Sequence, residues 1–371
     1  MIKWLKKLNR TRNHHFKKYK FKLKLTMLSI FSLRVFTRKI ERATKTNKIA
    51  IPFIGKGIGD AIVISGLVDT LANNGFEVSV IADKKLYFLF TNWRNISKLV
   101  FFDSSNEEET ITELKGLGDF IFIDPHEITS STIHTFNIIK GSKPIKTIGF
   151  NKSFKIYDVL LEASQPLGHI SNKCIDVLRY LNIDTTTYDY VVRIPESDKN
   201  EASEYIHKIG DKKLVIFNPY GGVEARFFST EQISAILNCL AEYADKIHVI
   251  IIGEKNRLKG INVGGNISKN PYPSFFTAAQ MIKECHLVIT PDTSIVHLSR
   301  VFNKRMLCFY PLKHLSNGED NADVWSPNYN NAVQIRLSEE NLQDASIDGL
   351  IGHIRNEINS IIGAGNEFYR G

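Results

Sequence analysis

The stretch KIAIPFIGKGIGDAIVISGLVDTL, from Lys48 to Leu71, decides the fold of this chain. An apolar run leads into Gly55, Gly57 and Gly59, and a second apolar pattern follows Asp60. This order predicts a β-strand, a glycine-rich turn and an α-helix. Glycine lets a ligand approach the main chain closely, and the free N–H groups of a helix start attract negative charge. Asp60 is therefore either a helix cap or a base held beside a ligand.

The same stretch partly matches the fingerprint of dinucleotide-binding proteins. That fingerprint is G-x-G-x-x-G, and here Asp60 stands in place of the third glycine. Asp83, which ends the next apolar run, lies where a carboxylate could bind the ribose of NAD. A nicotinamide-dependent oxidoreductase is therefore one hypothesis, although the missing glycine disfavours it.

The charge of the chain is unevenly distributed. Its 371 residues suffice for two domains, and the formal net charge is +9. Residues 1–48 contain 16 Lys and Arg against the acidic Glu41, a net charge of +15, while the remaining 32 basic and 38 acidic residues give −6. A folded body without excess positive charge argues against nucleic-acid binding. The basic segment predicts an anionic partner.

Segment 1–47 mixes its basic residues with many aromatic and aliphatic ones. No apolar run there is long enough to span a membrane, and the pattern is not that of a signal peptide. Basic amphipathic helices of this kind lie on anionic membrane surfaces. We therefore expect a cytoplasmic protein held peripherally at the inner face of the cytoplasmic membrane. A solvated extension, or a helix packed on the body, is the alternative.

The cysteines and histidines predict neither a disulfide framework nor a metal site. Cys174, Cys239, Cys285 and Cys308 are scattered, with no C-x-x-C pair, which is typical of buried thiols in a reducing compartment. No H-E-x-x-H motif occurs. We expect no protein-bound metal and no cofactor.

Strand-like and helix-compatible stretches alternate along the rest of the chain, which predicts βαβ units and parallel sheets. The expected α/β architecture has a Rossmann-like lobe over 48–165, a linking region over 166–197 and a second Rossmann-like lobe over 198–338. A C-terminal helical segment over 339–371 follows, and its stretch 339–361 is expected to cross back over the first lobe. Two lobes facing a central cleft would bind ligands at the carboxyl ends of their strands.

A loop in the second lobe has the composition of a diphosphate cradle. Asn218-Pro-Tyr-Gly-Gly222 follows a predicted strand, and Arg226 comes shortly before the next helix. Gly222 permits close approach, and Arg226 offers a bidentate positive charge. A solvated surface loop is the alternative interpretation.

The stretch PDTSIVH, from Pro291 to His297, marks the next change from strand to helix. Asp292 or Thr293 is expected to cap this helix, and Thr293 and Ser294 can donate to a phosphate. His297 lies one turn further along the same face, where a structural role competes with a functional one. Glu254 follows another strand, and it could bind ribose hydroxyls or cap a helix.

Three of these stretches together resemble glycosyltransferase family 9, the ADP-heptose:lipopolysaccharide heptosyltransferases. The segment GIGDAIVISGLVDTL resembles the family's N-terminal signature, and NPYGGVEARFFSTEQI resembles its central nucleotide-sugar loop. TPDTSIVHLSRVFNKRMLCFY resembles its DTG-x-x-HL-A motif. The three occur in the family's order and cover most of residues 48–312.

The resemblance implies a GT-B fold and an inverting, metal-independent glycosyltransferase. It implies that the first lobe binds a lipopolysaccharide or lipooligosaccharide core acceptor and the second binds ADP-heptose. Asp60 would be the general base, and Arg226 would match a phosphate-contacting lysine. The remaining expected substrate-binding residues are Gly59, Gly222, Glu254, Asp292, Thr293, Ser294 and His297.

The chain also departs from the family pattern. Gly66 replaces a proline, Ser294 a glycine and Arg226 a lysine, while Phe228-Ser229 replaces a Trp-Pro pair. These changes put the identity of the donor in question more than the fold. A transferase with another nucleotide sugar therefore stays open, as does a non-catalytic GT-B protein that binds a glycolipid.

Overall fold

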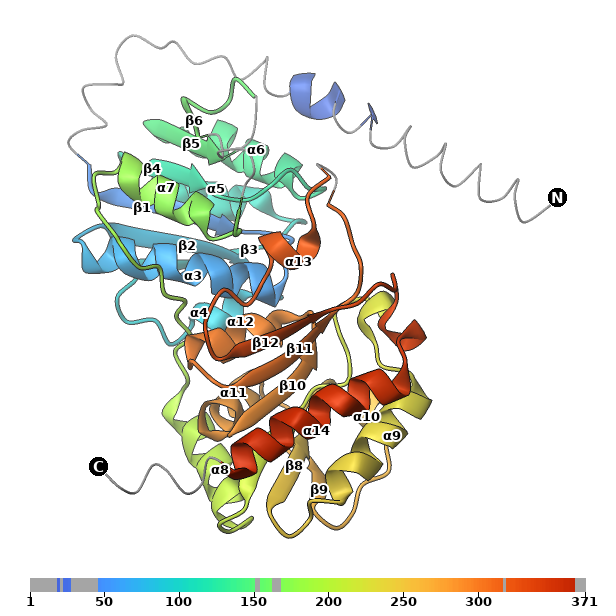
Figure 1. The fold of residues 1–371 in the computed structure, drawn as a ribbon. Helices are drawn as coiled ribbons and strands as arrows, with labels where there is room; N and C mark the ends of the chain where they lie inside the picture. The colour runs from blue at the N-terminus through green and yellow to red at the C-terminus, as the bar shows by residue number, and fades with distance from the viewer. Residues whose placement is uncertain are drawn as a thin grey trace, which may run out of the picture. The chain divides into compact units, whose positions relative to one another are not determined.

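The computed structural model describes residues 19–20, 23–27, 46–150, 154–161, 168–315 and 318–363. Contacts divide the chain into two units, each containing one sheet (Figure 1). The first unit comprises residues 1–57, 66–164 and 171–188, and the second comprises 58–65, 165–170 and 189–371. The first turns of the helix after Gly57 therefore pack with the second unit.

The first unit contains a six-stranded parallel sheet of order β3-β2-β1-β4-β5-β6. Parallel neighbours require crossover connections, which the intervening helices provide. The strands are β1 Lys48–Phe53, β2 Glu77–Asp83, β3 Lys98–Phe102, β4 Ile121–Asp124, β5 Lys146–Phe150 and β6 Val159–Leu161. The helices are α3 Ile58–Asn73, α4 Tyr87–Phe90, α5 Glu107–Lys115, α6 Thr132–Ser142 and α7 Asn172–Tyr180.

The second unit repeats this topology in a parallel sheet of order β12-β11-β10-β7-β8-β9. Its strands are β7 Lys213–Phe217, β8 Ile247–Ile251, β9 Ile267–Lys269, β10 Leu287–Pro291, β11 Met306–Tyr310 and β12 Ala332–Arg336. Its helices are α8 Glu196–His207, η2 Glu224–Arg226, α9 Thr230–Ala241, α10 Lys255–Leu258, α11 Phe275–Glu284, α12 Ser294–Val301, α13 Asn321–Val324, η3 Leu342–Asp344 and α14 Ile347–Gly363. Counted along its own unit, each sheet has the Rossmann order 3-2-1-4-5-6.

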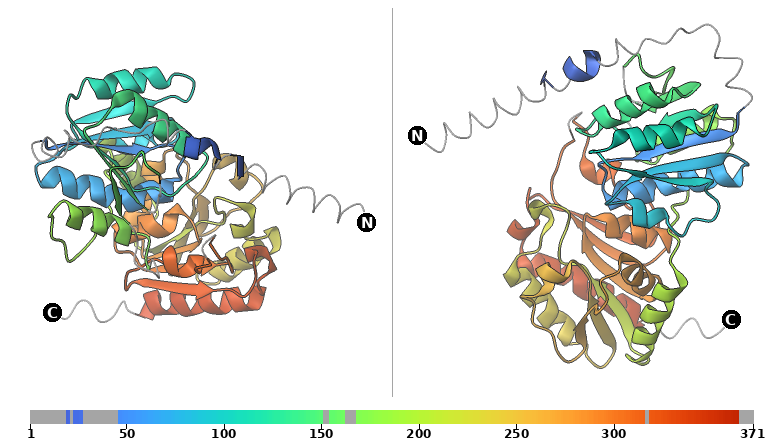
Figure 2. Two further views of the ribbon diagram at one scale, coloured as in Figure 1. Left: turned by 90° about the horizontal axis from the view of Figure 1, so that it is seen from above. Right: turned by 180° about the vertical axis from the view of Figure 1, so that it is seen from behind.

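The strands of both sheets are apolar runs because helices cover the two faces of a parallel sheet. Every residue of β10 and β11 is buried. Figure 2 shows helices on either side of the second sheet. The predicted α/β class and its two Rossmann-like lobes are confirmed.

The C-terminal helix α14 belongs to the second core. It packs on α9, β10 and β11, and its buried side chains include Leu350, Ile354 and Ile358. The capping box of α9 supports this packing, because Gln232 also donates to the main-chain oxygens of Leu342 and Ala345. The expectation that this segment crosses back over the first lobe is therefore wrong.

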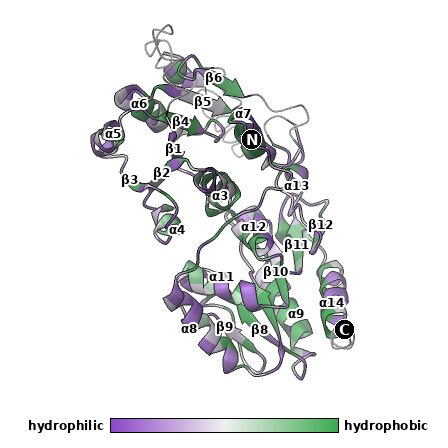
Figure 3. Cartoon of the chain, turned by 90° about the vertical axis from the view of Figure 1, so that its left-hand side faces the viewer, coloured by the Kyte–Doolittle hydropathy of each residue, from purple (hydrophilic) through white to green (hydrophobic). Residues whose placement is uncertain are grey.

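Helix α3 differs from the other helices in being apolar on all sides. Residues 61–68 are buried without interruption, whereas in α8 only Ala202 is buried. Figure 3 shows this contrast as a mainly hydrophobic α3 and a mainly hydrophilic α8. A helix that is apolar all round is a buried helix, so α3 is held by its surroundings and not by one amphipathic face.

Most of segment 1–47 lies outside the described residues. Residues 23–27 are helical, with Leu25 buried in the core cluster of the first unit. Tyr19, Leu23 and Met27 are exposed, and they recur every four residues. Among the described helices, none has the length and apolar character needed to cross a membrane.

Candidate active site

The topology identifies one switch point in each sheet, and ligands of α/β proteins bind at such points. In the first sheet it lies between β1 and β4, where Gly55 follows β1. In the second sheet it lies between β7 and β10, where Asn218 and Asp292 follow the strands. Two loops with predicted site residues therefore leave neighbouring strands of the second sheet.

Asn218 joins the ends of those two strands. Its main-chain N–H donates to Ile289 O at 2.9 Å, and its Nδ2 donates to Thr290 Oγ1 at 3.0 Å. Nδ2 also lies 3.4 Å from Thr293 Oγ1. Asn218 is only 4% exposed, so these contacts fix the loop after β7 relative to the start of α12.

Arg226, in η2, is bound to Asp292 at two points. Its Nη2 lies 2.8 Å from Asp292 Oδ2, and its Nη1 donates to Asp292 O at 3.1 Å. Asn321 Nδ2 donates to the same Oδ2 at 2.8 Å. Burial raises the pKa of the Asp292 carboxyl, and Arg226 and Asn321 oppose that shift. The predicted phosphate-binding arginine is thus oriented by a buried carboxylate.

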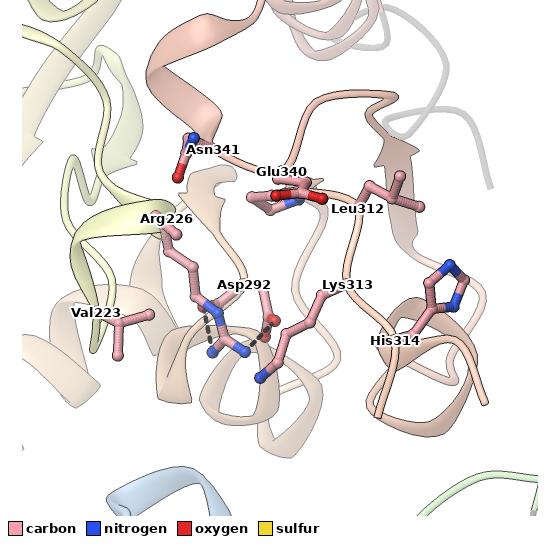
Figure 4. A pocket seen from close by; sticks show the side chains of 10 residues that line it. Val223, Arg226, Asp292, Leu312, Lys313, His314, Glu340 and Asn341 are labelled. Atoms are coloured by element: carbon pink, nitrogen blue, oxygen red, sulfur yellow. Dashed lines mark hydrogen bonds and ion pairs between the residues drawn. The ribbon is translucent and has the colours of Figure 1, made fainter. Parts of the chain in front are cut away.

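A pocket of about 400 Å³ opens beside this ion pair (Figure 4). Residues from η2, from the end of β10 and from the loops after β11 and β12 line it. They are Val223, Ala225, Arg226, Asp292, Pro311, Leu312, Lys313, His314, Glu340 and Asn341. Such a volume, with charged groups on an apolar wall, is typical of small-ligand sites.

Helix α12 begins with an ordered cap. Thr293 is its N-cap, and Thr293 Oγ1 accepts from the N–H of Ile295 at 3.0 Å. Ser294 is the first helical residue and is half-buried. Of the two residues predicted to cap this helix, Thr293 does so, and the positive end of α12 lies next to Asp292.

His297 is a buried, neutral residue. Its ring lies edge-on to Tyr190 and Trp325, with centroids 6.0 and 5.7 Å away. Burial lowers the pKa of His297 to about 3, and His169 and Arg300 contribute further. Its Nδ1 has no hydrogen-bond partner among the described residues. His297 therefore offers a hydrogen-bonding group but no positive charge near neutral pH.

The start of α3 lies against α12. A Cβ added at Gly59 would come 3.2 Å from His297 Cδ2 and 3.5 Å from the Cα of Ser294. The structure thus brings Gly59, in the first turn of α3, into contact with the PDTSIVH motif. Asp60 is half-buried and is the third residue of α3. It is an acidic residue of the first turn and not the N-cap.

Gly221 and Gly222 have different surroundings. A Cβ at Gly221 would lie 2.5 Å from Arg226 Cβ, so only glycine fits beside this arginine. A Cβ at Gly222 would meet nothing within 4 Å. Gly221 is thus required by protein packing, and close approach of a ligand at Gly222 stays a prediction.

Glu254 lies away from this ion pair, at the N-cap of α10. Its side chain is 74% exposed and pairs with Arg257 at 3.1 Å, without a side-chain cap hydrogen bond. Arg257 also donates to Gly221 O at 3.3 Å and stacks on the Phe227 ring. Glu254 is thus adjacent to the loop after β7 through Arg257, and it does not line the pocket.

Asp83 has a structural role in the first unit. Its Oδ2 accepts from the N–H of Gly55, which has a φ of 66°, and its Oδ1 accepts from Lys85 N at 3.0 Å. The carboxylate that the oxidoreductase hypothesis needs for ribose is therefore engaged in holding the glycine loop. Within the described ranges, no group of three or more His, Cys, Asp or Glu side chains could hold a metal ion.

Sequence reasoning missed Asn218, Lys313 and Asn321 as site residues. Asn218 is the first residue of the loop Asn218–Gly222. Its position directly after a predicted strand could have identified it as a site residue. Lys313 and Asn321 follow the last motif, where no pattern marks them. Only the tertiary structure brings them to Asp292.

Comparison with known proteins finds a relative whose name agrees with the family resemblance of the three motifs. No protein-family model matches it. It is 25% identical over 342 residues to a protein of Escherichia coli (strain K12) named "Putative lipopolysaccharide heptosyltransferase 4", covering 90% of this chain and 94% of that protein. The resemblance predicted from the three motifs is confirmed.

Solved structures share the fold at low sequence identity. The glycosyl transferase family 9 protein of Veillonella parvula DSM 2008 has a TM-score of 0.68 and 15% identity, over 84% of this chain and 97% of that one. E. coli ADP-heptose lps heptosyltransferase II has a TM-score of 0.65 and 12% identity, over 85% and 99%. The predicted GT-B fold is thereby confirmed.

Proposed function

We propose that this protein is an inverting glycosyltransferase that moves heptose from ADP-heptose onto a lipopolysaccharide or lipooligosaccharide core. The observation that carries the proposal is the site at the second switch point, where the Arg226–Asp292 pair, directly before the N-cap of α12, lines a pocket. The similarity to proteins named as heptosyltransferases supports the same donor and acceptor.

The chemistry requires stabilisation of a leaving diphosphate. As the anomeric C–O bond breaks, its electron pair stays with ADP, whose diphosphate gains negative charge. We propose that Arg226 and the positive N-terminal end of α12 stabilise that charge, because both lie beside Asp292. Because they are held before the reaction begins, they need little rearrangement as it proceeds. No step of this scheme requires a metal ion.

Asp60 is the proposed general base. The acceptor hydroxyl oxygen forms a bond to the anomeric carbon from the side opposite the leaving group, so the configuration inverts. The hydroxyl proton passes to the Asp60 carboxylate. The contact of neighbouring Gly59 with His297 supports this role, because it brings the start of α3 to the donor-binding helix.

The acceptor suggests that the enzyme works at the membrane surface. We propose that segment 1–47 binds anionic lipid, with its cations near the headgroups and an apolar face in the interface. The net charge of residues 1–48, +15, supports this, as does the exposed series Tyr19, Leu23 and Met27. Burial of Leu25 suggests that part of the segment is anchored on the first unit.

Calorimetric titration of the purified protein against ADP, UDP, GDP, CMP and NAD, with and without Mg²⁺, tests the donor class. We expect preferential binding of ADP that does not depend on Mg²⁺. Preference for another nucleotide would contradict ADP-heptose as the donor. Binding of none would favour the non-catalytic alternative.

A further inference from the structure

Without Lys313, the charged side chains that line the second-unit pocket would have a net negative charge. Arg226 is paired with Asp292, and Glu340 adds a negative charge on the opposite wall. Without Lys313 the charged side chains of this lining would sum to −1, counting His314 as neutral. A nucleoside diphosphate would meet a site that repels it. Lys313 brings the sum to zero and adds a second cation near Arg226.

Lys313 is placed so that its ammonium reaches the ion pair. It lies in the loop after β11, and in Figure 4 its side chain points toward Arg226 and Asp292. Partial burial lowers the pKa of Lys313, and repulsion from Arg226 lowers it further. The two cations are thus close enough to interact through space.

Among the described residues, none binds the ammonium of Lys313. In the part of the chain that the structure describes, it has neither a hydrogen bond nor an ion pair. Arg226, in contrast, already uses Nη1 and Nη2 on Asp292. None of the three N–H donors of Lys313 is thus used by another described residue, whereas Asp292 occupies two of the five donors of Arg226.

The loop that carries Lys313 is fixed to the ion pair through one residue. The main-chain N–H of Asn321 donates to Lys313 O at 2.9 Å, while Asn321 Nδ2 donates to Asp292 Oδ2 at 2.8 Å. Asn321 is 3% exposed. A second contact, from Leu312 N to Glu339 O at 2.8 Å, ties the loop to the chain after β12. The main chain at Lys313 is thus fixed, while its side chain can adjust to a ligand.

We propose that Lys313 binds the donor diphosphate, as a second cation beside Arg226. The proposal rests on the nucleotide-sugar transferase function proposed above. It assigns Lys313 to the phosphates and not to the base or ribose, because it points to the Arg226–Asp292 pair. Two cations from different loops would share the charge of the diphosphate, with the Lys313 ammonium adding its donors to those that Arg226 does not use on Asp292.

The test compares Lys313→Gln, Lys313→Arg and the control Lys283→Gln in the full chain. Lys283 is an exposed lysine of the same unit on α11, outside the pocket lining. Affinities for ADP and adenosine are measured by calorimetry at one salt concentration. We expect Lys313→Gln to weaken ADP binding about ten-fold or more, the effect of losing one charge-assisted contact, with adenosine affinity unchanged. Lys313→Arg and Lys283→Gln should bind ADP nearly as the wild type does.

The outcomes separate this proposal from the function on which it rests. If the wild type binds ADP and Lys313→Gln binds it equally well, the assignment of Lys313 is overturned and the transferase function stands. Equal weakening of ADP and adenosine binding would also overturn it, because the effect would not arise at the phosphates. If the wild type binds no nucleoside diphosphate, the proposed function itself fails. Thermal unfolding of each variant shows whether lost affinity reflects lost folding.

Discussion

The guanidinium of Arg226 binds both the carboxylate and the main chain of Asp292. Its Nη2 lies 2.8 Å from Asp292 Oδ2, and its Nη1 donates to the carbonyl oxygen of Asp292 at 3.1 Å. The carboxylate is 6% exposed, so it depends on this partner. Removing one member of a buried ion pair costs about 3–5 kcal/mol, whereas replacing both can be nearly neutral.

We therefore predict that Arg226→Met destabilises the protein by about 3 kcal/mol or more. The double variant Arg226→Met/Asp292→Asn should recover much of that loss, because no unpaired buried charge is left. Urea unfolding of the two single variants and the double variant measures the coupling. Additive effects would show that the pair contributes no coupling energy.

The contact between Gly59 and His297 predicts the effect of one added methyl group. A Cβ at Gly59 would press on His297 Cδ2 at 3.2 Å, and Tyr190 and Trp325 flank that ring. Gly59→Ala should therefore lower both the melting temperature and glycosyl transfer.

Gly352 in α14 supplies the matched control. A Cβ there would meet nothing within 4 Å, so Gly352→Ala should raise stability by about 0.5–1 kcal/mol through helix propensity. A stabilising effect of both substitutions would contradict the tight contact at Gly59.

His169 and His297 predict that stability falls as the pH is lowered. Burial lowers the pKa of His169 to about 4 and that of His297 to about 3, from 6.5. The unfolded chain therefore binds more protons than the native state below pH 6.5. The stabilisation is complete above pH 6.5 and is lost as the pH falls toward 4, by about 1.4 kcal/mol per pH unit for each histidine.

Unfolding free energies between pH 5 and 7.5 test this dependence. The variant His169→Asn should show a shallower slope than the wild type, since one of the two groups no longer titrates. An unchanged slope would mean that other groups cause the acid sensitivity.

The membrane proposal predicts that lipid binding depends on the sign of charge in segment 1–47. Replacing Lys20 and Lys24 by Glu in the full chain should weaken sedimentation with anionic vesicles at least ten-fold, because each cation near the surface contributes about 1 kcal/mol. The control Lys208→Glu/Lys283→Glu makes the same change of charge on exposed positions of the second unit. Equal loss in both variants would point to net charge and not to this segment.

Local patterns predicted the elements that carry the motifs. The strand and helix expected within residues 48–71 correspond to β1 and α3, and the helix expected after Arg226 is α9, whose capping box is a sequence signal. The region 166–197, expected to link the lobes, contains the nine-residue helix α7. The bounds of such elements are the part of a fold that sequence patterns predict least well.

The site residues that could be predicted from the sequence are those that lie within one of the quoted motifs. Arg226, Asp292, Thr293 and Ser294 do come together, since they follow neighbouring strands of one sheet. Asn321 could not be found this way. It contacts Asp292 across 29 residues of sequence, and a buried amide in a loop has no local signature.

The most direct test of the account is glycosyl transfer itself, with Asp60 as the variable. Purified wild-type protein is incubated with ADP-heptose and a heptose-deficient lipopolysaccharide core, and the product mass is measured. The comparison uses Asp60→Asn and, as an isosteric control in the same helix, Asp69→Asn. We predict that the wild type and Asp69→Asn add one heptose, and that Asp60→Asn binds ADP normally but transfers at least 100-fold more slowly, the scale of general-base catalysis. Near-normal transfer by Asp60→Asn, or no transfer by a wild type that binds ADP, would contradict it.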